Sequence, residues 1–95
     1  MNGLFRDLDP HNIHIENWDV SKVEEMDYMF SGCENFDCDL SKWNISKVKS
    51  MKGMFRNCKK FHSDLSNWDV SRVDRMYGMF DGCKKCKTPT WYKDE

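Results

Sequence analysis

Apolar and polar residues follow one another in a pattern that predicts a helix near the start of a repeated segment. The apolar positions fall on one face of a helix of roughly three turns, at Val23, Met26, Met29 and Phe30. The polar positions fall on the opposite face, at Lys22, Glu24, Glu25 and Asp27. Ser21 with Glu24 forms a capping box at the start. Gly32 accepts the left-handed conformation expected at the end.

A second pattern follows each predicted helix and is typical of a short strand. In residues 39–43, Leu40 is flanked by polar residues, so we expect Leu40 to point into the core and Ser41 to face outward. The aspartates that open these segments, Asp39 and Asp64, recur in step with the apolar residues. We expect them to accept backbone N–H bonds in a turn, which is a structural task.

The whole pattern recurs at a fixed interval along the chain. Tryptophan, methionine, phenylalanine and cysteine each return at this interval, for example at Trp18, Trp43 and Trp68 and at Cys33, Cys58 and Cys83. A fixed period of this length predicts stacked repeats whose recurring columns form the core. The predicted fold is therefore an α/β repeat with one short parallel strand and one helix in each coil.

We expect a single domain over residues 1–95. Residues 1–17 are predicted to be an N-terminal cap that corresponds to a truncated first repeat, and 87–95 to be a C-terminal cap and tail. Between them, the second, third and fourth repeats are predicted at 18–42, 43–67 and 68–86. Pro89 interrupts the last strand pattern, and Trp91 comes earlier than its place in the repeat register. Both features are typical of a closing unit.

Over about residues 18–86, the chain repeats a motif that resembles a known repeat. The motif is W-[DN]-[VI]-S-x-V-x2-M-x2-M-F-x2-C-x2-F-x2-D-L-S-x-W. It is similar to the BspA-like, leucine-rich-repeat-related unit of bacterial surface proteins, in the version found in mycoplasmal and listerial lipoproteins and grouped as a domain of unknown function. The resemblance implies a short leucine-rich-repeat-like solenoid used for binding. It supplies no catalytic residues.

The cysteines predict buried thiols. Their number is odd, and three of the five occupy one repeat position: Cys33, Cys38, Cys58, Cys83 and Cys86. Cysteines that recur at one repeat position are typical of small core residues in a reducing compartment. A disulfide between cysteines of neighbouring repeats remains an alternative. Cys83 and Cys86, with Cys58 and His62, are residue types that bind zinc, but the second closely spaced pair of a zinc ribbon is missing. We expect no metal and no cofactor.

Charge changes sharply along the chain. Residues 18–42 carry a net charge of −5, residues 43–67 of +5 and residues 68–92 of +2. This distribution predicts an acidic and a basic half, although helix faces that are merely solvated would drift in charge in the same way. The candidate partner-binding residues are the charged ones at variable repeat positions: Lys47, Lys49, Lys52, Arg56, Lys59, Lys60, Arg72, Arg75, Glu24, Glu25 and Asp27.

These observations predict a non-enzymatic protein–protein interaction module. No nucleophile elbow, phosphate loop or paired-acid motif is present in the sequence. The alternative is a small phage- or virus-encoded inhibitor that blocks a host nucleic-acid-handling or defence complex, such as an anti-CRISPR-like protein, through its charged surfaces. Direct nucleic-acid binding ranks below both, because no aromatic residue is interleaved with the lysines.

We expect a monomer or a salt-sensitive head-to-tail assembly, since the two halves carry opposite charge. The N-terminus shows no secretion signal and no apolar run is long enough to cross a membrane. We therefore expect a cytoplasmic protein, in the host cytoplasm if viral, with surface localisation only for a fragment of a longer exported chain.

Overall fold

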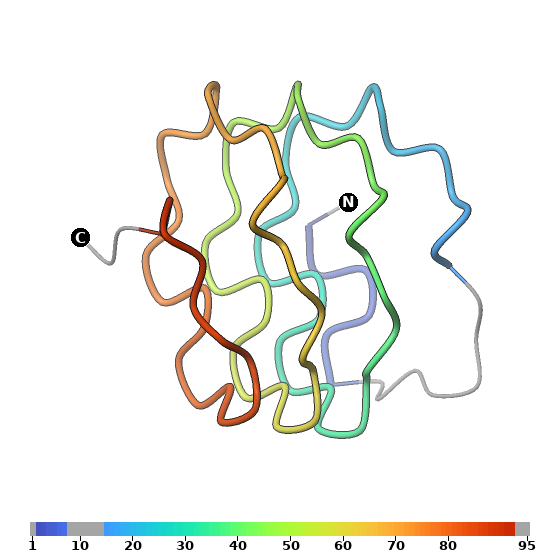
Figure 1. Cartoon of the computed structure of the whole chain (residues 1–95). Helices are drawn as coiled ribbons and strands as arrows, with labels where there is room; N and C mark the ends of the chain where they lie inside the picture. The colour runs from blue at the N-terminus through green and yellow to red at the C-terminus, as the bar shows by residue number, and fades with distance from the viewer. Residues whose placement is uncertain (1, 8–14, 93–95) are drawn as a thin grey trace.

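The computed structural model describes residues 2–7 and 15–92, and successive repeats lie side by side in it (Figure 1). Part of the predicted N-terminal cap, residues 8–14, lies outside the described residues. The described chain contains no helix, and its only β pairing consists of isolated parallel bridges between Glu25 and Ser50 and between Ser50 and Arg75. The predicted α/β repeat, a leucine-rich-repeat-like solenoid with a strand and a helix in each coil, is therefore wrong.

The helix prediction fails because a left-handed residue stands in the middle of each predicted helix. Tyr28 has φ 57°, and the residues at its place in the next two repeats, Gly53 and Gly78, have φ 56° and 69°. A residue with positive φ breaks a right-handed helix. The backbone runs instead through successive turns, such as Met29 N to Met26 O at 3.4 Å and Ser31 N to Tyr28 O at 3.2 Å. The feature of the sequence that argued against a helix was the glycine at positions 53 and 78, inside the predicted helices.

Backbone hydrogen bonds join each repeat to the next with a constant offset. The N–H groups of Met26, Tyr28 and Phe30 donate to carbonyls of the next repeat at 2.9, 2.7 and 2.9 Å. In each case the acceptor is the residue just before the equivalent position. The third repeat donates to the fourth in the same way, as in Phe55 N to Met79 O at 2.9 Å. The backbone polar groups are thus satisfied between repeats, where a helix would satisfy them within one.

The predicted strand at residues 39–43 is a turn. Trp43 N bonds to Leu40 O at 3.1 Å, and Asp39 Oδ1 accepts the Ser41 N–H at 3.0 Å. Asp64 does the same for Ser66 at 3.0 Å, so the expectation that these aspartates accept backbone N–H bonds is confirmed. Ser21 is no helix cap, because its N–H and its hydroxyl both donate to Asp19, at 3.0 and 2.6 Å.

The core consists of columns of like residues, as the repeat pattern predicts. The Phe30 and Phe55 rings stack at 5.8 Å, and Phe55 stacks on Phe80 at 5.8 Å. Trp43 and Trp68 are buried and donate their indole N–H groups to Ile15 O and Leu40 O, both at 2.9 Å. The end of the tryptophan column differs from the prediction, since Trp18 is 41% exposed.

The last tryptophan keeps its place although it comes early in the sequence. The Trp91 indole donates to Leu65 O at 2.9 Å, which continues the series of tryptophan bonds to the preceding repeat. Its ring stacks on Trp68 at 6.4 Å. The shortened segment before Trp91 therefore closes the column without breaking it.

Acid is expected to destabilise the fold through its aspartate turns. Hydrogen bonds from the serine at the second position after each aspartate lower the pKa of Asp19, Asp39, Asp64 and Asp69 below the usual 3.8. A carboxyl with a lower pKa in the folded state contributes stability that is complete above its unfolded pKa and lost as the pH falls through its folded pKa. Urea midpoints measured at about pH 5 and at steps below the usual aspartate pKa of 3.8 should show a continuous decrease. A midpoint that stays constant across that range would contradict the role of these turns, and Asp39→Asn should flatten part of the decrease.

Candidate functional site

Six of the predicted partner-binding residues lie together on one face. They line a hollow of about 400 Å³, here called the charged trough, together with Ser50 and Asp74. The full set is Glu24, Glu25, Asp27, Lys49, Ser50, Lys52, Asp74 and Arg75. Ser50 and Asp74 were missed, although they occupy the same repeat positions as Glu25 and Glu24 and could have been found from the register.

The trough is built on the hydrogen bonds that join the repeats. Its floor contains the parallel bridges at Glu25, Ser50 and Arg75. Lys49 N donates to Glu24 O at 2.7 Å, and Asp74 N donates to Lys49 O at 2.9 Å. Equivalent residues of adjacent repeats therefore stand next to one another across the face, and their side chains form rows of defined order.

Asp27 is the most firmly held residue of the trough. Its Oδ1 accepts the Ser50 hydroxyl at 2.6 Å and the Lys52 N–H at 2.9 Å. Its Oδ2 lies 3.8 Å from Lys52 Nζ, which also lies over the Tyr77 ring at 5.8 Å. Both side chains of this ion pair are largely buried, so the pair is fixed rather than available to a partner.

Glu24 and Lys49 are available at the surface. Lys49 Nζ lies 3.0 Å from Glu24 Oε1, with both side chains 61% exposed, and this contact lowers the pKa of Glu24. Exposed pairs of this kind contribute little to stability, because water and salt screen their charges. Their charges can therefore be re-paired with a partner at low cost.

The opposite charges of adjacent repeats face one another. Besides the pairs in the trough, Lys59 Nζ lies 2.9 Å from Glu34 Oε1. The step from −5 to +5 along the sequence therefore corresponds, at these positions, to ion pairing between neighbouring repeats. The remaining predicted residues are exposed and lie outside the trough: Lys47, Arg56, Lys59, Lys60 and Arg72.

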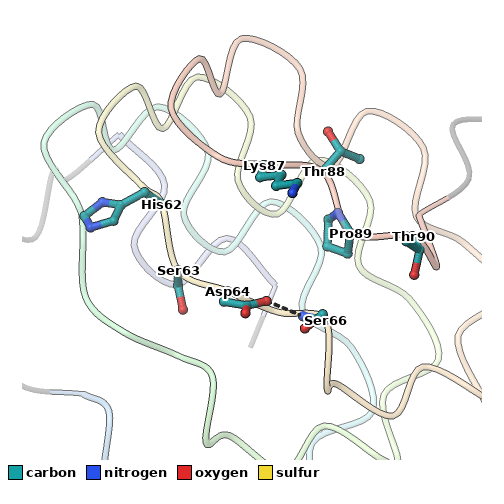
Figure 2. Close-up of a pocket in the computed structure, with 8 residues that line it drawn as sticks. All are labelled: His62, Ser63, Asp64, Ser66, Lys87, Thr88, Pro89 and Thr90. Carbon is teal, nitrogen blue, oxygen red and sulfur yellow. Dashed lines mark hydrogen bonds between the residues drawn. The ribbon is translucent and has the colours of Figure 1, made fainter.

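A second hollow of about 370 Å³ lies between the third repeat and the C-terminal segment (Figure 2). Its lining is His62, Ser63, Asp64, Ser66, Lys87, Thr88, Pro89 and Thr90. In Figure 2 the His62 ring points away from the Asp64 carboxylate, which is bonded to Ser66 N. His62 Nδ1 lies 3.0 Å from Lys60 O instead. The interruption at Pro89 was visible in the sequence, but no hollow was predicted there.

The candidate zinc residues do not form a ligand set. Cys58 is buried with its Sγ 2.9 Å from Phe30 O, while His62 lies at the C-terminal hollow. Within residues 2–7 and 15–92, no three His, Cys, Asp or Glu side chains are grouped as a metal site. The five cysteines, all within the described ranges, carry no disulfide.

Residues 2–7 and 15–92 include no helix with the length and hydrophobicity that a membrane span requires. No curated protein and no solved structure matches the chain. One family model matches residues 1–92, which is nearly the whole sequence. On that match, the chain belongs to the family described as "Mycoplasma protein of unknown function, DUF285".

Proposed function

We propose that this chain is a non-enzymatic protein-interaction module and that it binds its protein partner through the charged trough. The observation that carries the proposal is the gathering of six variable, charged repeat positions on one face, over a backbone fixed by hydrogen bonds between repeats. Four of them are exposed and available to a partner: Glu24, Glu25, Lys49 and Arg75. The recurring residues of the repeat are occupied elsewhere, in the buried columns and the aspartate turns. The resemblance of the motif to BspA-like surface repeats supports a binding role and is part of this proposal.

The order of charges in the trough defines the partner surface that fits it. Across the rows, Glu24 is followed by Lys49 and Asp74, and Glu25 is followed by Ser50 and Arg75. A partner face of mixed charge, with acidic groups opposite the trough's cations and basic groups opposite its carboxylates, matches this order. Electrostatic matching of this kind favours specificity and fast association.

A charge swap tests the proposal without changing net charge. The double variant Glu24→Lys with Lys49→Glu keeps the ion pair but reverses the charges that a partner meets. The matched control is Glu34→Lys with Lys59→Glu, which swaps a similarly exposed pair with a 2.9 Å contact outside the trough. A photo-crosslinking residue at position 24 identifies the partner in cells, and calorimetry then compares the purified proteins.

We expect the trough swap to weaken binding at least about tenfold, which corresponds to about 1.4 kcal/mol, and the control swap to leave it unchanged. Thermal unfolding should be nearly the same for both variants, because exposed pairs contribute little. Equal binding by both variants would exclude the trough as the contact surface. Reproducible turnover of a substrate by the purified protein would overturn the non-enzymatic role.

A further inference from the structure

The fourth repeat carries a cysteine where the second and third carry a phenylalanine. In those repeats a turn leads from the buried cysteine to a buried ring, from Cys33 to Phe36 at 3.2 Å and from Cys58 to Phe61 at 3.3 Å between backbone N and O. The turn of the fourth repeat, over residues 84–85, leads from Cys83 to Cys86. Two thiols therefore stand at the ends of one turn.

The geometry of this turn suits a bond between the two sulfurs. The Cys83 thiol donates to Cys58 O at 3.2 Å and the Cys86 thiol to Lys87 O at 3.8 Å, so no other side chain is bonded to either sulfur in these contacts. The ends of a four-residue turn lie within about 7 Å at Cα, and a disulfide spans about 4.4–6.8 Å between Cα atoms. Cys86 is half-buried, whereas Cys83 is only 8% exposed. Cys86 is thus the more accessible of the two thiols to a small reagent, and Cys83 is buried at the other end of the same turn.

The two thiols differ in acidity. The neighbouring Cys83 thiol lowers the pKa of Cys86 below its usual value, and the Cys86 thiol together with burial raises the pKa of Cys83. The thiolate is the nucleophile in thiol–disulfide exchange. Cys86, which is both more acidic and more exposed, is therefore the thiol that reacts first.

We propose that Cys83 and Cys86 form a reversible dithiol–disulfide site that is oxidised by small disulfides of the glutathione class. The Cys86 thiolate, its proton lost to water, attacks one sulfur of glutathione disulfide and releases one glutathione thiolate. Cys83 then loses its proton and attacks the Cys86 sulfur, which forms the intramolecular disulfide and releases the second glutathione. Two protein thiols are oxidised, one glutathione disulfide is reduced to two glutathione molecules, and the two protons end on these products.

Counting thiols in the folded protein after incubation with glutathione disulfide tests this site. Alkylation in denaturant followed by intact-mass measurement should show a fall from five thiols to three, and dithiothreitol should restore five. In the variant Cys83→Ser the second step is removed, so we expect one glutathione to remain attached per chain. In Cys86→Phe, which restores the residue found in the other repeats, all four remaining thiols should persist.

The control variant is Cys38→Ser, because Cys38 is also half-buried but its burial raises its pKa to about 11. This variant should still lose two thiols, from four to two. Five thiols persisting in the oxidised wild-type protein would overturn the proposal. So would a loss of two thiols in Cys86→Phe, or a disulfide between two chains. Tryptophan fluorescence confirms that each variant is folded.

Discussion

Replacing Phe55 by alanine is expected to lower the free energy of unfolding by about 4 kcal/mol. Phe55 is fully buried and stands at the centre of the aromatic column. Its ring stacks on Phe30 and Phe80, both at 5.8 Å, and on Phe61 at 4.2 Å. The substitution removes the ring from contacts with three repeats at once, and the hydrogen-bonded backbone on both sides limits the collapse of the cavity.

The loss is large relative to the whole stability of a domain of this size, about 5–15 kcal/mol. Urea unfolding followed by tryptophan fluorescence measures it. The matched control is Phe5→Ala, at the end of the same column, where the ring is only half-buried and stacks on Phe30 at 5.5 Å. The control should cost clearly less. Equal losses in the free energy of unfolding for the two variants would show that the centre of the column contributes no more to stability than its end.

Replacing Gly53 by alanine is expected to cost about 3 kcal/mol through two effects that can be separated. The residue has φ +56°, and an L-residue in this region costs about 1–2 kcal/mol. In addition, a Cβ at this position would lie 2.5 Å from Tyr28 Cε1, so the ring of the preceding repeat must shift. Overpacking of this kind typically costs about 1–3 kcal/mol.

Gly3→Ala is the matched control for the backbone effect. Gly3 occupies the same repeat position with φ +62°, but its nearest side-chain atom, Arg6 Cβ, is 4.0 Å from the added carbon. It should therefore show the backbone cost alone. In a Tyr28→Ala background, Gly53→Ala should lose its steric part and approach the control. If Gly53→Ala costs no more than Gly3→Ala in the wild-type background, the contact with Tyr28 does not limit this position.

The charged trough could be predicted in part. The candidate residues were visible as charged side chains at variable repeat positions, and the register alone places Glu24 beside Lys49. The ion pairs between these residues were not apparent from the sequence, which shows only an acidic repeat followed by a basic one. Lys47 and Arg72 carry the same kind of charge and still lie outside the trough. Which face each position occupies depends on the turns that precede it.

The sequence by itself determined the period of the repeat, the identity of the core columns and the aspartate turns. These features depend on residue type and spacing, which recur in every repeat.

Only the tertiary structure decided the backbone conformation. The apolar spacing of Val23, Met26, Met29 and Phe30 fits a helix as well as a series of turns, so it could not distinguish the two. The N–H groups of Met26, Tyr28 and Phe30 bond to carbonyls of the following repeat. Those acceptors come into reach only when that repeat is stacked in place, and their bonds, together with the left-handed residue at position 28, replace the helix.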